Sequence, residues 1–325
     1  MKRLILMGAA LVLLPFLALA CGGGDDTEDD STAVPETATV PAAIDISKDD
    51  LGRSVKAPAS PQRVVAMSPT VVELMYAVGA TPVGRPSSAN YPDAAKSVEN
   101  FGTSYQPSLE VIASMRPDLI IADAIIHQPM IDQLASLGVP VWAVKVDSFD
   151  SVVSGLEKVG ALTGKQEKGQ TEAKALEDKM AAVKAKLPSQ QPSVLVVVAA
   201  GPGQFIASKD SSYLGSLLKD LGAKNVAGSE ADNFRFPGFA DYSLEKIVQA
   251  NPDVIIGISV GGPPGTPKTT ELLGMTPVWS GLKAVKNGSV KEVDHVIYLE
   301  SAGPRVSQIL DELPRLLYPN VFASR

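Results

Sequence analysis

The stretch LEVIASMRPDLIIA at residues 109–122 returns later in the chain as LEKIVQANPDVIIG at residues 244–257, with seven of fourteen positions identical. In each copy a short run with helical spacing ends at a Pro-Asp pair, and a β-branched run follows. Because a residue before proline is biased away from helix, the pattern predicts a helix, a stop and a buried strand. Such a pattern is common enough to recur by chance, but the two copies, 135 residues apart, hold the same position within each series of strands and helices, which favours an internal duplication.

The segments around each copy continue this alternation of strands and helices. RVVAM at 63–67 predicts a buried strand, and the helix expected over 68–80 has Ser68 as its N-cap and Pro69 at its first position. A second series of strands and helices starts at SVLVVVA, residues 193–199. Alternation of this kind is typical of parallel-type sheets covered on both faces. We therefore expect an α/β protein with two Rossmann-like lobes.

A different pattern separates the two series. Residues 166–187 contain no strand signal and no proline, and apolar side chains recur there at spacings of three and four. This pattern predicts one long helix that joins the lobes. The apolar face consists of Ala173, Leu176, Met180, Val183 and Leu187. We expect a signal peptide at 1–20, followed at 21–50 by an acidic tether that begins with a lipidated cysteine. An N-terminal lobe at 51–165, a connecting helix at 166–188 and a C-terminal lobe at 189–325 complete the chain.

The N-terminus has the parts of a secretory signal. Lys2 and Arg3 precede an apolar run over 4–20 that ends in small residues. Cys21, the only cysteine of the sequence, follows directly; it is either a leftover thiol or a lipidation site, since ALAC resembles the lipobox of bacterial lipoproteins. Residues 22–43 are rich in Gly, Asp, Glu, Thr and Pro, which predicts a flexible tether. We expect a lipid-anchored protein on the extracytoplasmic face of the cell membrane.

Composition argues against several classes of function. The formal net charge is −7 and Lys and Arg form no basic run, so nucleic acid is not an expected partner. Two histidines are too few for a zinc or manganese site that needs about three of them with an acid. The H-E-x-x-H motif of metalloproteases is missing as well. We expect no catalytic residue, no metal and no cofactor.

Three stretches carry a resemblance to a known family: PQRVVAMSPTVVELMYAVGATPVG at 61–84, GTSYQPSLEVIASMRPDLIIA at 102–122 and QLASLGVPV at 133–141. They resemble the substrate-binding proteins of cobalamin, haem and iron–siderophore ABC importers. The likeness runs from about residue 52 to the C-terminus and is more specific in the first lobe. It implies a monomer that holds a small molecule between its lobes, moves little because one helix links them, and docks on a permease dimer.

The family presents one surface glutamate per lobe to arginines on the two permease subunits, at the start of this helix–Pro-Asp–strand unit. The matching positions here are Glu110 and Glu245. A permease with two-fold symmetry presents the same pocket twice, so a duplicated carboxylate is its complement. Each glutamate taken alone is also explained by its favourable place near the positive end of a helix dipole.

The resemblance also implies which side chains face the ligand from loops after the strands. Aromatic rings suit a flat macrocycle or a catecholate, and arginine suits a carboxylate, phosphate or hydroxamate. The expected ligand-binding residues are Tyr91, Tyr105, Phe205, Arg235, Phe239, Tyr298 and Arg305. Tyr298 could instead be a core residue, and Arg305 could hold a helix end. His127 could face the cleft and bind the metal of a haem or corrin, although a lone histidine is more often a surface or loop residue.

The ligand itself stays open at this stage. Tyr105 and Phe239 stand where the best-known cobalamin binder of the family has tryptophans, so a siderophore or haem is as compatible with the sequence as cobalamin. Two other functions are alternatives to import: a ligand sensor that docks on a receptor, and, less favoured, an extracellular hydrolase.

Overall fold

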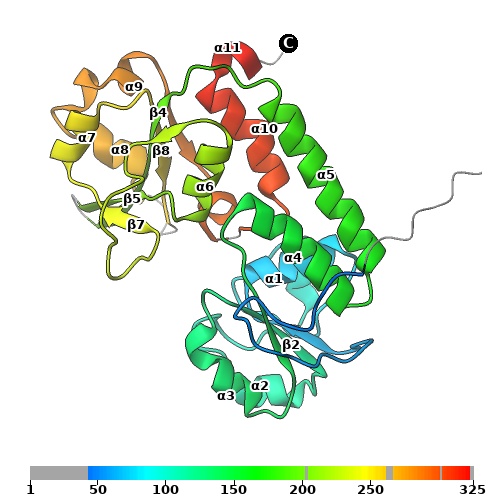
Figure 1. Cartoon of the computed structure of the whole chain (residues 1–325). Helices are drawn as coiled ribbons and strands as arrows, with labels where there is room; N and C mark the ends of the chain where they lie inside the picture. Colours follow the sequence, from blue (N-terminus) through cyan, green and yellow to red (C-terminus); the bar gives the residue numbers. More distant parts are fainter. Residues whose placement is uncertain (1–42, 202–203, 261–265, 301, 323–325) are drawn as a thin grey trace, which may run out of the picture. The chain divides into compact units, whose positions relative to one another are not determined.

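The computed structural model describes residues 43–201, 204–260, 266–300 and 302–322 (Figure 1). The expected signal peptide and Cys21 lie outside the described residues. Among the helices within these ranges, none combines the length and the apolar character needed to cross a bilayer.

The first sheet, the centre of the N-terminal lobe, has three parallel strands in the order β1-β2-β3. Every residue of these strands is buried, as expected for a parallel sheet covered on both faces. The strands are β1 (Val64–Ala66), β2 (Leu119–Asp123) and β3 (Val141–Val144). The helices are α1 (Pro69–Ala77), η1 (Asp93–Ser97), α2 (Leu109–Ser114), η2 (Gln128–Met130), α3 (Ile131–Ala135) and α4 (Phe149–Leu162).

The second sheet, the centre of the C-terminal lobe, is mixed. Its parallel part comprises β4 (Ser193–Gly201), β6 (Lys224–Asn225), β8 (Val254–Ile258) and β9 (Val290–Val293). Its antiparallel edge comprises β5 (Gln204–Ser208) and β7 (Phe239–Asp241). The helices are α6 (Tyr213–Asp220), α7 (Leu244–Ala250), α8 (Thr269–Gly274), η3 (Trp279–Gly281), α9 (Lys283–Lys286), the π-helical segment η4 (Val296–Glu300), α10 (Val306–Leu317) and α11 (Pro319–Phe322).

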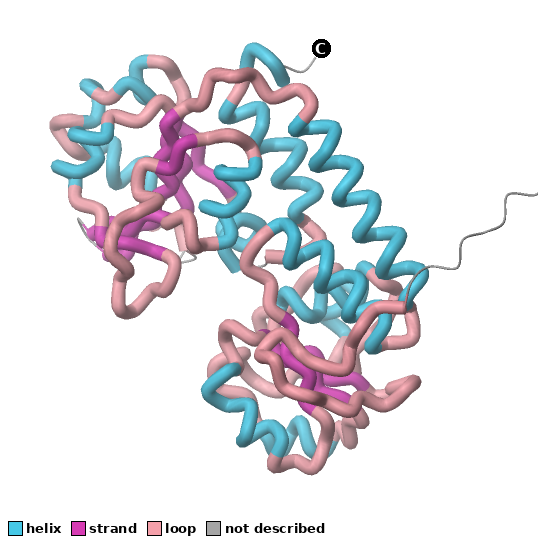
Figure 2. The backbone as a smooth tube through the Cα atoms, viewed as in Figure 1, coloured by secondary structure: helices cyan, strands magenta, loops and turns pink. Residues whose placement is uncertain are grey.

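The long helix expected between the two sheets is α5 (Gln166–Lys184). Four of its five predicted apolar positions are buried, whereas Leu187 lies beyond the helix and is half-buried. α5 runs beside α4 and α10 (Figure 2). Its contact with α4 is close, because a Cβ on Gly169 would lie 2.5 Å from the Leu156 carbonyl oxygen. Buried side chains of both lobes and of α5 form one continuous hydrophobic cluster.

The duplicated phrase forms the same unit twice, as α2–β2 and α7–β8. Ser108 and Ser243 cap the two helices by accepting hydrogen bonds from Val111 N–H and Lys246 N–H. Arg116 and Asn251 turn the chain before each Pro-Asp with left-handed backbones, at φ 47° and 38°. The predicted helix, stop and buried strand are thus confirmed in both copies.

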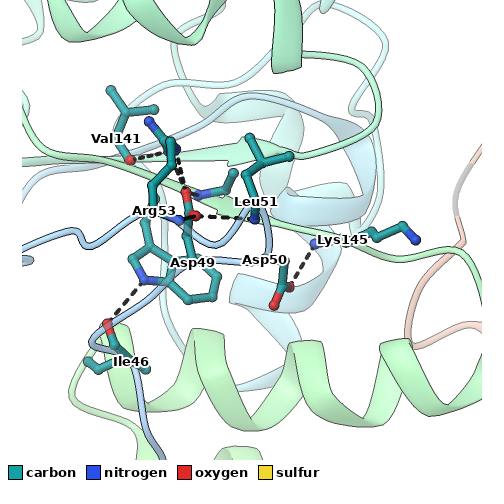
Figure 3. Close-up of polar contacts among 9 residues, drawn as sticks. Ile46, Asp49, Asp50, Leu51, Arg53, Val141 and Lys145 are labelled. Carbon is teal, nitrogen blue, oxygen red and sulfur yellow. Dashed lines mark hydrogen bonds and ion pairs between the residues drawn. The ribbon is translucent and has the colours of Figure 1, made fainter.

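Residues 45–55, which we call the N-terminal strap, bind the edge strand β3 (Figure 3). The Asp49 carboxylate accepts hydrogen bonds from Ala143 N–H and from the Arg53 guanidinium, which also donates to the Val141 carbonyl. Asp50 accepts from Lys145 N–H at 2.9 Å. The strap thereby covers unpaired backbone groups of an edge strand. We expected the tether to continue to residue 50, but Asp49 and Asp50 are already part of the lobe.

Candidate functional site

A cavity of about 330 Å³ lies where α1 and the loop after Arg85 meet η4 and the start of α10. It is therefore lined by both lobes, and small-molecule sites occur preferentially at such interfaces. Two of the seven predicted ligand residues, Tyr91 and Arg305, line it. The lining residues are Pro69, Glu73, Ser88, Asn90, Tyr91, Val296 and Arg305.

A buried ion pair crosses this cavity from one lobe to the other. Glu73 stands in the middle of α1, where its neighbours from Thr70 to Met75 are all buried. Its carboxylate binds the Arg305 guanidinium through both oxygens, at 2.8 Å from Nε and 2.5 Å from Nη2. The two side chains are 3% and 9% exposed. Two parallel bonds of this kind fix both position and orientation, so the guanidinium is held rigidly.

Tyr91 covers the face of the same guanidinium. Its ring centroid lies 4.5 Å from Arg305 Cζ, within cation–π range. Tyr91 as a whole is 46% exposed, so it is also accessible to a ligand. The buried Arg85 holds the loop that carries Tyr91, since its guanidinium donates to the carbonyls of Pro86 and Lys96. Arg85 is thus a positioning residue for this wall of the cavity.

Tyr213, at the start of α6, has a buried hydroxyl that makes no hydrogen bond within the described part of the chain. Burial raises the pKa of this phenol well above its usual range, and the negative charge of Glu73 raises it further. The hydroxyl therefore stays protonated, and it lies close enough to Glu73 to be influenced by its charge.

Two further predicted residues, Tyr105 and Arg235, are exposed and do not line this cavity. Tyr105 precedes α2 and is 73% exposed. Arg235 lies over the ring of Phe234 at 5.3 Å, in a loop that is exposed from Phe234 to Pro237. Phe239 is half-buried in β7 and packs against the main hydrophobic cluster.

Phe205 and Tyr298 were expected in loops that face the ligand, and the structure corrects both. Phe205 lies in β5, 6% exposed, in the core of the C-terminal lobe. Tyr298 is 2% exposed in η4, and its hydroxyl donates to Glu312 at 2.9 Å. Periodicity did not reveal β5 because it is a short antiparallel strand of five residues. For Tyr298, the core interpretation that the sequence left open is the one that the structure supports.

The His127 imidazole is buried and hydrogen-bonded within the N-terminal lobe. It is fully buried; Nδ1 accepts from Asp123 N–H at 3.0 Å, and Nε2 lies 3.0 Å from the Ser104 carbonyl, to which it donates in the matching tautomer. Burial lowers its pKa, which favours this neutral form. Both ring nitrogens are thus engaged and neither is available to a metal. Among the residues that the structure describes, no group of three potential metal ligands occurs.

Residues 257–261, GISVG, fit the G-x-S-x-G pattern of serine hydrolases, in which the serine is the nucleophile and is paired with a histidine. The Ser259 hydroxyl donates to the Glu292 carboxylate and accepts from Thr269 N–H at 2.7 Å. Its hydrogen bonds involve no histidine, and they link the end of β8 to the start of α8. Ser259 therefore has the contacts of a structural residue.

Sequence reasoning missed Glu73, although a signal for it was present. A single carboxylate inside the apolar run TVVELMYA cannot be buried without a partner. That partner could have been sought among the predicted ligand arginines. Ser88, Asn90 and Val296 gave no such signal, because only the folded loop and η4 bring them to the cavity.

Glu110 and Glu245 occupy equivalent positions in the first turns of α2 and α7, one residue after the first helical residue. Both side chains are exposed, and neither carboxylate has a hydrogen bond or ion pair with a described residue. The two carboxylates are therefore accessible to an outside partner.

Comparison with known proteins gives a family match. A model of the family described as "Periplasmic binding protein" matches residues 64–296. The uncharacterized ABC transporter substrate-binding lipoprotein YvrC of Bacillus subtilis is 28% identical over 337 residues, 99% of each chain. The vitamin B12-binding protein of Salmonella choleraesuis is 31% identical over 221 residues, 68% of this chain and 78% of the relative.

A solved structure shows the same fold. The periplasmic heme-binding protein BhuT in complex with two hemes superposes with a TM-score of 0.68 and 25% identity, covering 81% of this chain and 100% of BhuT.

Proposed function

Because this chain belongs to the periplasmic binding protein family, we propose that it is an extracytoplasmic lipoprotein that binds a cobalamin-, iron-siderophore- or haem-type ligand and delivers it to an ABC importer. The observation that carries the proposal is the cavity lined by both lobes, in which Arg305 and Tyr91 meet. The names of a vitamin B12-binding relative and a heme-binding structure support the ligand class.

Anchoring through Cys21 is supported by the sequence around it and by a relative. ALAC follows an apolar signal run, and the relative YvrC, which spans the whole chain, is named a lipoprotein. In such an arrangement the lipid fixes the protein near its permease, and the acidic segment before the N-terminal strap lets the lobes reach it.

Docking through Glu110 and Glu245 is supported by their geometry. Both carboxylates are exposed, follow a serine N-cap and occupy the same place in a duplicated unit. An arginine pocket on each of two permease subunits would pair with one of them, and each such pair combines charge with directional hydrogen bonds. We expect the protein to act as a monomer on a permease dimer.

Isothermal titration calorimetry of the mature protein with cyanocobalamin, a ferric siderophore and haemin tests the ligand proposal. We expect saturable binding of one of the three. Tyr91→Ala should weaken it about tenfold through loss of ring contact. Tyr105→Ala is the matched control, because Tyr105 is exposed outside the cavity. Absence of binding to all three would refute the ligand class, and equal effects of the two variants would refute the cavity as the site.

A further inference from the structure

The cavity carries two charged side chains of opposite sign. Glu73 and Arg305 are its only charged lining residues among those the structure describes; the other five are Pro69, Ser88, Asn90, Tyr91 and Val296. Since the two charges are joined by two hydrogen bonds, the cavity presents no net charge to a ligand. The sequence suggested that Arg305 would suit a ligand carboxylate, phosphate or hydroxamate, whereas its guanidinium already binds the Glu73 carboxylate.

A ligand carboxylate could reach the guanidinium in the usual bidentate way only by replacing Glu73. The displaced Glu73 would then be a carboxylate at 3% exposure without its cation, beside the protonated hydroxyl of Tyr213. Separating a buried carboxylate from the cation that it binds is strongly unfavourable. Nor can the guanidinium turn toward the ligand, because Glu73 fixes its edge and Tyr91 covers its face.

An uncharged acceptor can bind without breaking the pair. Of the three guanidinium nitrogens of Arg305, Nε and Nη2 bind Glu73, while Nη1 makes no hydrogen bond to any described residue. Nη1 can therefore donate to a carbonyl or amide oxygen. Two polar residues, Ser88 and Asn90, and the aromatic residue Tyr91 line the same space. Such a surface suits a ligand with amide groups around an apolar or aromatic body.

We infer that Glu73 is a specificity-determining residue: by neutralising Arg305 it makes the cavity prefer an uncharged, amide-bearing ligand over one that presents carboxylates. The inference rests on the proposed binding function and narrows it. Among the ligands named for the relatives, vitamin B12 has the uncharged, amide-bearing periphery and heme presents carboxylates.

The experiment compares Glu73→Gln with the unaltered mature protein in titrations with cyanocobalamin, haemin and ferric citrate. The unaltered protein should bind cyanocobalamin best. Glutamine keeps the size of the side chain but leaves Arg305 positive, so affinity for haemin or ferric citrate should rise about tenfold, with a smaller change for cyanocobalamin. Asp178→Asn is the matched control, since it changes net charge equally at a site 65% exposed on α5.

The outcomes separate this inference from the proposed function. If the unaltered protein binds a ligand and Glu73→Gln does not change the preference among the three ligands, the role of Glu73 is overturned and the proposed binding function stands. Tightest binding of a carboxylate ligand by the unaltered protein overturns it as well. Failure of all three ligands to bind either protein overturns both proposals. If Glu73→Gln does not fold, the affinities of the unaltered protein for haemin and for its dimethyl ester are compared instead. The uncharged ester should bind more tightly than haemin, and tighter binding of haemin would overturn the inference.

Discussion

The two copies of the duplicated unit, α2–β2 and α7–β8, have the same backbone and different side-chain contacts. Each aspartate of the Pro-Asp pair binds the start of the neighbouring strand. Asp118 accepts hydrogen bonds from Gln62 N–H and Arg63 N–H, at 2.6 and 2.9 Å. Asp253 accepts from Ser193 N–H at 2.9 Å, but also from the Ser193 hydroxyl and the Lys283 ammonium, both at 2.7 Å.

The left-handed residues differ in the same way. The Asn251 side chain accepts from Lys283 N–H at 2.9 Å, whereas the Arg116 side chain makes no hydrogen bond to a described residue. The duplication therefore extends to the cap, the turn and the strand, and each lobe has added its own contacts. The exposed glutamates of both copies make no hydrogen bond or ion pair to a described residue, so their identity is explained either by the helix dipole or by the permease partner proposed above.

The largest effect is expected when both glutamates are reversed. Glu110→Lys with Glu245→Lys should reduce uptake of the ligand to background in cells that carry the permease, because each lysine would face an arginine. Ligand affinity should stay within about twofold, since both residues lie outside the cavity. Each single variant should be intermediate if the two copies are equivalent.

The control for this experiment is Glu167→Lys with Glu177→Lys, which makes the same charge change at exposed positions of α5. Normal uptake by the Glu110/Glu245 double variant would eliminate docking through these residues. Equal loss in the control would assign the effect to net charge instead of to position.

Removal of each aspartate should have the next largest effect. Asp118→Ala leaves two backbone N–H groups without their acceptor, which should lower the free energy of unfolding by about 2 kcal/mol. Asp253→Ala should cost more, because the Lys283 ammonium loses its partner as well. Urea unfolding of both variants measures the difference. A larger loss at Asp118 would contradict the view that the second copy is more extensively fixed.

Asp253 also makes a pH-dependent contribution to stability. Hydrogen bonds from Lys283 and Ser193 lower its pKa to about 2. Since the unfolded value is about 3.9, the contribution is present above about pH 4 and disappears as the pH falls toward 2. The side chain is 36% exposed, so solvent screening limits the effect to about 1 kcal/mol. Asp253→Asn should reduce the dependence of the free energy of unfolding on pH between about pH 2 and pH 4, as measured by urea unfolding at a series of pH values. An unchanged pH dependence would show that other groups cause it.

Much of this fold was accessible from the sequence because its signals are local. Ser68 caps α1 as predicted from its place before a helical pattern, and the apolar spacing identified α5. The antiparallel edge formed by β5 and β7 was not accessible from the sequence, because strands of five and three residues carry little periodicity. The N-terminal strap was missed because its composition resembles that of the tether, while its binding depends on backbone groups of β3 that no local pattern reveals.

The candidate site was accessible only in part. Arg305 and Tyr91 were found through the family resemblance, but their contact joins residues more than two hundred positions apart. Glu73 is recognisable as an anomaly in an apolar helix, yet its partner is not. Aromatic character alone did not separate ligand residues from core residues, as Phe205 and Tyr298 show, because a buried ring satisfies both patterns.

Removing the two helix caps should have equal, smaller effects. Ser108→Ala and Ser243→Ala each delete a side-chain acceptor for a backbone N–H of the first turn, worth about 1 kcal/mol. Thermal unfolding should therefore show the same shift for both, and the double variant should show their sum because the sites lie in different lobes. A clear difference between the two would mean that the duplicated helices are not equivalent in their capping.

The smallest effects are expected at the left-handed residues, and there the two copies should differ in sign. Arginine at φ 47° bears a steric cost that glycine lacks, so Arg116→Gly should stabilise the protein by about 0.5 kcal/mol after the entropic cost of glycine. Its carbonyl, which accepts from the Arg63 guanidinium, is kept. Asparagine tolerates this conformation better, and Asn251→Gly loses the bond from Lys283 N–H, so it should destabilise by roughly 0.5–1 kcal/mol. Chemical unfolding of the pair measures both signs. Stabilisation by both variants would show that backbone strain governs the two turns alike, whereas opposite signs would show that the second copy depends on a contact made by its side chain.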